Sequence, residues 1–271
     1  MGLFNFLKSR QAPPTTMPVQ SCMLNYRRLY SVFNNSAEDF RNAQPFPHIV
    51  IDNFLDEDIA DLIISHFPKI DPRGWITRIA KSNSGRDAQQ LKWDFALARK
   101  DLDYELSLHP AIRYLLLELN SITFLKGLRS LTGIGSLISD PKMWGGGLHQ
   151  TKRGGLLRVH ADFLKHPTYN FDRRLNLLLF LNPRWESEWH GGLELWSQDM
   201  KEKVVSIAPI ANRCVIFSTS RHSYHGYTQP IQCPDNITRK SIAMYYYTVP
   251  IEADPDDITE TYWQDLPGEN N

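Results

Sequence analysis

The stretch LLRVHADF, residues 156–163, has the apolar alternation of a half-buried β-strand. Two polar residues, His160 and Asp162, interrupt it two positions apart. Successive side chains of a strand point to opposite faces, so these two share one face, about 6.6 Å apart along the chain. An imidazole and a carboxylate that converge in this way are two of the three protein ligands of an open metal site.

The sequence around this stretch predicts a mainly β protein with flanking helices. From about residue 136, seven short apolar or alternating runs are separated by Gly, Pro and Asn, which indicates an all-β barrel or sandwich. Residues 47–54 predict a short strand, and residues 55–67 predict a helix with an acidic N-cap. A second helical region begins near Pro110 and continues or restarts until Gly133. We expect these helices to brace the sheet.

We expect one globular domain with a tail at each end. Residues 1–20 are rich in Pro and Thr and predict a flexible tail. Residues 21–135 are expected to brace the core, and residues 136–250 to form it. Residues 251–271 contain acidic residues and neither Lys nor Arg, so a solvated acidic tail is predicted.

Composition excludes several classes of partner. Lys and Arg number 30, as do Asp and Glu, so no net charge attracts nucleic acid or an anionic membrane. The three cysteines Cys22, Cys214 and Cys233 are too scattered for a disulfide framework or a CxxC zinc motif. The sequence shows no signal peptide and no spanning apolar run. We therefore predict a cytoplasmic protein; its oligomeric state is left open.

The third metal ligand is expected from a distant strand of the same barrel. His225 in SYHGYTQP is the candidate, and Gly226 beside it would allow close approach of another backbone. Two histidines and one carboxylate form the facial triad that holds non-haem Fe(II) with open positions, whereas four protein ligands close a structural zinc site. His222 is the alternative distal ligand, although a spacing of three reverses the strand face.

A spacing of two recurs in TRKSIAMYYYT, where Arg239 and Ser241 share a strand face. A buried arginine needs a carboxylate partner, and its planar fork binds one bidentately. With a hydroxyl beside it, the pair suits a dicarboxylic co-substrate. Lys240 is the rival anchor, but only one of two neighbouring residues can face the pocket, and Ser241 accompanies Arg239.

Taken together, the His-x-Asp pair, the distal His and the Arg-x-Ser pair resemble the Fe(II)- and 2-oxoglutarate-dependent oxygenases. RRLNLLLFLNPRW followed by HGGLELW and SYHG is similar to the prolyl 4-hydroxylase-type branch. The resemblance covers about residues 136–250 and implies a double-stranded β-helix, or cupin-like jelly roll. The implied site residues are His160, Asp162 and His225 on iron, and Arg239 with Ser241 on the far carboxylate of 2-oxoglutarate.

One position departs from the pattern of this family. Many relatives carry a tyrosine near the end of the aliphatic strand, where it bonds the co-substrate, but this chain has Leu179 and Phe180. We expect Asn176, earlier on the same strand, to supply a polar contact instead. The alternative is an asparagine with a purely structural role.

The resemblance implies an oxidoreductase that uses Fe(II), 2-oxoglutarate and dioxygen, with ascorbate as a candidate reductant. Because Asp162 is present, hydroxylation of an unactivated C–H bond is favoured over halogenation, with release of succinate and CO2. The substrate is expected to be an amino acid, a peptide or another small molecule. Residues 78–95 and 140–155 are the candidate mouth segments, as a lid or as ordinary loops. The alternative functions are a non-catalytic jelly-roll binding or scaffold protein and a zinc hydrolase.

Overall fold

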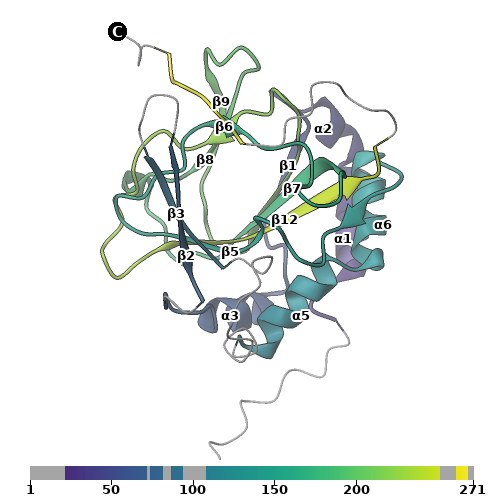
Figure 1. The fold of residues 1–271 in the computed structure, drawn as a ribbon. Coiled ribbons are helices and arrows are strands. Elements are labelled where there is room, and N and C mark those ends of the chain that lie inside the picture. Colours follow the sequence, from purple (N-terminus) through teal and green to yellow (C-terminus); the bar gives the residue numbers. More distant parts are fainter. Residues whose placement is uncertain (1–21, 72–73, 82–86, 94–107, 251–260, 268–271) are drawn as a thin grey trace, which may run out of the picture.

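The computed structural model is built from two antiparallel sheets that face each other, with helices on one side (Figure 1). The described residues are 22–71, 74–81, 87–93, 108–250 and 261–267. The predicted tail at residues 1–20 lies outside them, as does most of the acidic tail. Within the described residues, the predicted mainly β architecture with flanking helices is confirmed.

The larger sheet has the strand order β1-β10-β7-β12-β5-β3-β2, with β4 paired to β12. Its strands are β1 (His48–Ile51), β2 (Ile76–Lys81), β3 (Asp87–Trp93), β4 (Ile138–Ser139), β5 (Gly147–Thr151), β7 (Asp172–Phe180), β10 (Arg213–Ser218) and β12 (Arg239–Thr248). Strand β7 is buried on both faces, which explains its almost unbroken run of leucines. Leu175, Leu177 and Leu179 belong to the main hydrophobic core. Phe180 belongs to a second core, between the sheets.

The smaller sheet has the order β13-β6-β11-β8-β9. Its strands are β6 (His160–Ala161), β8 (Leu193–Trp196), β9 (Lys203–Ile207), β11 (His225–Gly226) and β13 (Tyr262–Trp263). Strands β6 and β11 have two residues each, and His160 lies directly opposite His225 in their antiparallel pair. Strand pairing therefore brings together two histidines that are far apart in the sequence.

The helices pack against the outer face of the larger sheet (Figure 1). They are α1 (Tyr26–Asn35), α2 (Ala37–Asn42), α3 (Glu57–Ser65), α5 (Pro110–Leu119) and α6 (Ile122–Thr132), with a 3-10 turn at Ser187–Trp189. The predicted helical region after Pro110 divides at Ser121, whose hydroxyl accepts a hydrogen bond from the Phe124 amide and so caps α6. Gly133 ends α6 in the left-handed conformation, with φ of 77°. No helix in the described ranges has the length and apolarity to span a bilayer.

Three segments differ from the expectations of the sequence. The candidate mouth segments contribute strands: residues 140–155 contain β5, and residues 78–95 overlap the β2–β3 hairpin. The glycines before β5 mark close packing, since a Cβ on Gly146 would lie 2.8 Å from the Ala243 carbonyl oxygen. Residues 262–263 of the predicted acidic tail form β13 and pair with β6.

Candidate metal centre

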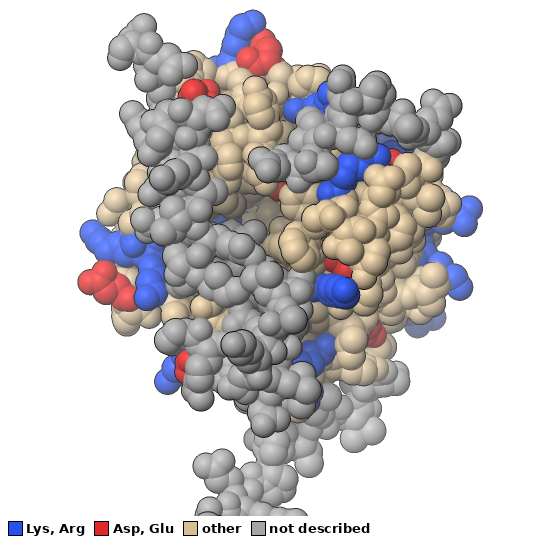
Figure 2. All heavy atoms as spheres, in the orientation of Figure 1, with Lys and Arg blue, Asp and Glu red and all other residues tan. Residues whose placement is uncertain are grey.

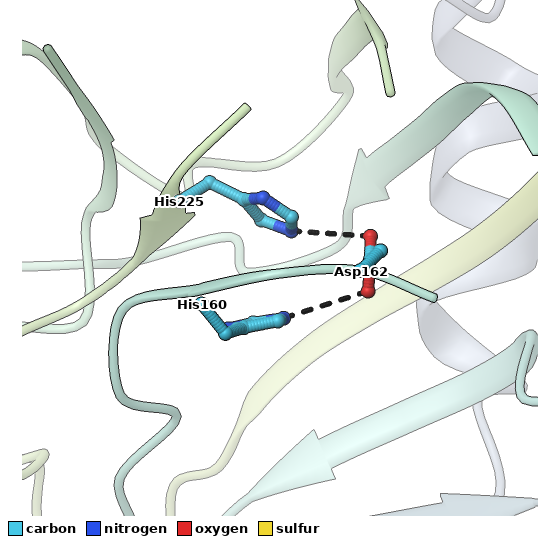
Figure 3. Close-up of side chains that lie close together, drawn as sticks. All are labelled: His160, Asp162 and His225. Atoms are coloured by element: carbon cyan, nitrogen blue, oxygen red, sulfur yellow. Dashed lines mark ion pairs between the residues drawn. The ribbon is translucent and has the colours of Figure 1, made fainter. Parts of the chain in front are cut away.

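Three buried side chains meet at one end of the barrel: His160 of β6, Asp162 just after it and His225 of β11 (Figure 3). One nitrogen or oxygen atom from each lies within 4.8 Å of the others. Nε2 of His160 lies 3.6 Å from Oδ1 of Asp162, and Nε2 of His225 lies 3.4 Å from Oδ2 (Figure 3). In the described part of the chain, no other group of His, Cys, Asp and Glu has this geometry.

Backbone carbonyls fix the orientation of both imidazole rings. Nδ1 of His160 lies 2.7 Å from the Arg158 carbonyl oxygen, and Nδ1 of His225 lies 2.9 Å from that of Ser223. Because a carbonyl only accepts hydrogen bonds, each Nδ1 carries the proton, and each Nε2 of a neutral ring presents its lone pair to the centre. This is the arrangement that metal-binding histidines adopt.

The protonation states of His225 and Asp162 suit a cation. Burial, together with the neighbouring His160, lowers the pKa of His225 to about 4, so the ring is neutral. Burial on its own would raise the pKa of Asp162, but the charge of the neighbouring Arg173 guanidinium holds it well below its usual value. The Asp162 carboxylate and the neutral His225 ring thus present lone pairs to the centre. Such a donor set fits a divalent metal ion.

A second layer of side chains holds the carboxylate of Asp162. Asn176 Nδ2 donates to Asp162 Oδ2 at 2.6 Å, and Arg173 Nη2 lies 3.0 Å from the same oxygen. Asn176 Oδ1 accepts from Nε and Nη2 of Arg173 at 2.9 and 2.7 Å. The Arg173 guanidinium lies against the rings of Phe163 and Tyr245, 4.5 and 3.5 Å from their centroids. Asn176 therefore directs its polar atoms to Asp162 and Arg173, which was not the contact expected from the sequence.

Gly226 explains how the histidine strands come so close together. A Cβ at this position would lie 2.5 Å from the Arg158 carbonyl oxygen. The next residue, Tyr227, donates its backbone N–H to the Leu157 carbonyl oxygen at 2.9 Å. The close backbone approach expected beside His225 is confirmed, and it requires glycine.

Arg239 and Ser241 lie together on the barrel face of β12, and Arg239 is only 4% exposed. Arg239 Nε donates to the Gly191 carbonyl oxygen at 2.6 Å, and its guanidinium carbon lies 4.9 and 5.1 Å from the ring centroids of Phe180 and Tyr227. Burial lowers the pKa of Arg239, and no carboxylate of a described residue forms an ion pair with it. A buried cation in this state suits an anionic ligand.

Lys240, the rival anchor, belongs to the opposite side of β12. Residues two and four positions after it, Ile242 and Met244, lie in the helix-covered core. Lys240 Nζ donates to the Thr238 carbonyl oxygen at 3.3 Å. Its side chain therefore does not share the face of Arg239 and Ser241.

Sequence reasoning missed two hydroxyl groups beside Arg239. The Tyr227 hydroxyl bonds Thr151 Oγ1 at 3.3 Å, and Thr151 is the cross-strand partner of Arg239. Tyr227 follows His225 by two residues, a spacing that could have placed both on one face. Thr151 lay in a segment that was expected to be a loop.

The alternative ligand His222 lies outside the triad, as do the buried histidines His149 and His166. His222 is exposed, and its ring contacts that of Tyr224. Nε2 of His149 lies 3.1 Å from the Gly145 carbonyl oxygen, and His166 pairs with Asp140 at 3.2 Å.

Figure 2, drawn in the orientation of Figure 1, shows a hollow near the centre of the described surface, with cationic and anionic side chains scattered around it.

Comparison with known proteins identifies a family model and solved structures that are similar to this chain. Residues 146–247 match the family model described as the 2OG-Fe(II) oxygenase superfamily. A prolyl 4-hydroxylase from Phytophthora capsici has a TM-score of 0.54 at 17% identity, over 89% of this chain and 70% of that one. The carbocyclase SnoK of nogalamycin biosynthesis, described as non-heme and α-ketoglutarate-dependent, has a TM-score of 0.50 at 13% identity, over 79% and 83% of the two chains. None of the curated protein sequences matches the chain. The likeness confirms the predicted jelly-roll core.

Proposed function

We propose that this chain, whose residues 146–247 match the family model of the 2OG-Fe(II) oxygenase superfamily, is an Fe(II)- and 2-oxoglutarate-dependent dioxygenase that hydroxylates an unactivated C–H bond. Its substrate is an amino acid, a peptide or another small molecule, and succinate and CO2 are the co-products. The observation that carries this proposal is the buried convergence of ligand atoms from His160, Asp162 and His225 within 4.8 Å.

The three side chains fit a ferrous ion as its protein ligands. Two imidazole nitrogens and one carboxylate oxygen are the donor set of non-haem iron sites, and three ligands leave positions open for other molecules. When bound, the ion would supply the redox chemistry that couples 2-oxoglutarate and dioxygen to substrate oxidation. The described residues supply no fourth ligand to this group, which disfavours a closed structural zinc site.

We assign a positioning role to Asn176 and Arg173. Both engage Oδ2 of Asp162, so Oδ1, on the side of His160, is the oxygen left for the ion. Their contacts also balance the buried negative charge of the carboxylate. In this assignment Asn176 acts on the metal ligand and does not touch the co-substrate.

The far carboxylate of 2-oxoglutarate is assigned to Arg239. Its guanidinium is buried between two rings, and an incoming carboxylate would supply the missing negative charge. Hydroxyl groups of Ser241, Tyr227 and Thr151 surround this position and could donate further hydrogen bonds. A zinc hydrolase has no use for such an anchor, which supports the oxygenase over that alternative.

Calorimetric titration of 2-oxoglutarate into the Co(II)-loaded protein tests this assignment. Hydrogen bonds to charged groups contribute about 1.5–3 kcal/mol, so Arg239→Met should weaken 2-oxoglutarate binding roughly 10- to 150-fold. Lys240→Met is the matched control, and it should bind 2-oxoglutarate as the wild type does. The reverse result would move the anchor to Lys240.

A succinate-release screen identifies the substrate and tests turnover. Iron, ascorbate and 2-oxoglutarate are supplied with a panel of amino acids, peptides and nucleotide sugars. Prolyl peptides come first, because one similar solved structure is a prolyl 4-hydroxylase. A protein that binds metal and 2-oxoglutarate but releases no succinate with any member would favour the non-catalytic alternative.

A further inference from the structure

Part of the C-terminal region returns to the strand that carries His160. Strand β13 pairs antiparallel with β6, so that Trp263 lies opposite His160 and Tyr262 lies opposite Ala161. The amide of Gln264 donates to the Val159 carbonyl oxygen at 2.9 Å and extends this pairing. Without β13, the two-residue strand β6 would form an edge of the smaller sheet.

The indole ring of Trp263 lies against the imidazole of His160. The ring centroids are 4.8 Å apart and the planes are inclined by 35°. Directly paired residues share a sheet face, so Trp263 lies on the face of the metal centre. Tyr262 points to the other face and is 53% exposed. His160 thus has aromatic neighbours in both Trp263 and His225, whose ring centroid is 4.5 Å away.

Further contacts hold Trp263 in place. Asp265 Oδ1 lies 4.0 Å from Arg158 Nη2, and the Arg158 side chain is almost fully buried. Leu266 packs against the hydrophobic cluster on the outer side of the smaller sheet, which contains Val159 and Ala161. The segment is therefore attached to the residues on both sides of His160. It lies beyond residue 247, where the match to the family model ends.

We propose that Trp263 is a positioning residue of the metal centre, which holds the His160 imidazole in the orientation that binds the ion. The C-terminal segment at residues 261–267 is then part of the active site. The Nδ1–H bond to the Arg158 carbonyl fixes one edge of the ring, and stacking on Trp263 restrains its rotation about that bond. This inference rests on the proposed metal site, but it concerns a residue that the family match does not include.

Quenching of tryptophan fluorescence by Co(II) tests the contact itself. An open-shell ion on His160 would quench an indole stacked on the same ring, so emission of the wild-type protein should fall as Co(II) binds. Trp263→Phe should lose most of that fall while still binding Co(II) by calorimetry. Trp75→Phe is the control, because Trp75 is buried in the helix-covered core, and it should keep the fall. An undiminished fall in emission when Co(II) binds to Trp263→Phe would overturn the proposal.

The Co(II) affinity of metal-free protein tests the positioning role. An aromatic contact of this kind contributes a factor of roughly 2 to 12, so Trp263→Ala should bind Co(II) more weakly by that factor, and Trp263→Phe should recover most of it. Tyr262→Ala removes the neighbouring ring from the same strand and should leave the affinity unchanged. Equal affinity in Trp263→Ala and the wild type would contradict the proposal. Failure of the wild type to bind Co(II) would instead refute the metal site.

Discussion

Replacing Asn176 with alanine separates two roles for this residue, as a support for Asp162 or as a contact of 2-oxoglutarate. The variant loses the 2.6 Å hydrogen bond to Asp162 and the acceptor for two N–H groups of Arg173. Arg173 keeps its ion pair with Asp162 at 3.0 Å. Hydrogen bonds to charged groups contribute about 1.5–3 kcal/mol each, so we expect the free energy of unfolding to fall by about 2–4 kcal/mol.

The metal affinity should fall as well, because the carboxylate of Asp162 loses one of the groups that orient it. Loss of a hydrogen-bond partner of a metal ligand typically weakens metal binding by about 10- to 100-fold. Asn182→Ala is the matched control. Asn182 is equally buried and donates to the Pro209 carbonyl oxygen at 2.6 Å, but it lies outside the metal centre. It should lose stability without losing metal affinity.

Urea denaturation of the metal-free proteins gives the stability, and Co(II) titration gives the affinity. We expect both variants to be less stable than the wild type and only Asn176→Ala to bind Co(II) weakly. Suppose instead that Asn176→Ala binds Co(II) normally and binds 2-oxoglutarate weakly. The residue would then contact the co-substrate, and our assignment would be wrong.

Three further substitutions test close packing and a buried hydrogen bond, one beside the metal centre and two among the helices. Gly226→Ala places a Cβ 2.5 Å from the Arg158 carbonyl oxygen; Co(II) titration should show lost metal binding, and unchanged binding would contradict the close approach. Glu118→Ala leaves two buried backbone N–H groups without their carboxylate acceptor. Urea denaturation should show that the free energy of unfolding falls by about 2–4 kcal/mol. A fall below about 1 kcal/mol would show that water accepts these hydrogen bonds in place of the carboxylate. Gly127→Ala, normally favourable in a helix, places a Cβ 2.7 Å from the Tyr30 ring and 3.0 Å from the Phe33 ring of α1; the melting temperature should fall, and a rise would mean that α1 shifts to make room.

Local patterns in the sequence were enough to predict the strands that carry alternating or continuous apolar residues. The leucines of β7 and the spacing of two at Arg239 and Ser241 both follow from the period of a strand. The same period placed His160 and Asp162 together, and the structure brings His225 to them by the pairing of β11 with β6. Their roles as metal ligands stay predictions until metal binding is measured.

Long-range contacts explain what the sequence did not indicate. Strand β5 follows a run of glycines, which resembles a loop until the backbone of Ala243 is seen against Gly146. The acidic composition around β13 suggested a solvated tail. Trp263 is instead held by strand pairing with His160, about a hundred residues earlier in the sequence. Asn176 could not be distinguished from a co-substrate ligand, because its contact with Arg173 depends on how the side chains pack.

The central claim is that His160, Asp162 and His225 bind a ferrous ion that uses 2-oxoglutarate. Iron-dependent succinate formation by the wild type and by Asp162→Asn, across the substrate panel, tests it most directly. Asparagine retains an oxygen acceptor for Arg173, whereas alanine would leave a buried guanidinium uncompensated, at a cost of about 3–5 kcal/mol. We predict succinate from the wild type and none from the folded variant; equal succinate formation by both proteins would contradict the account.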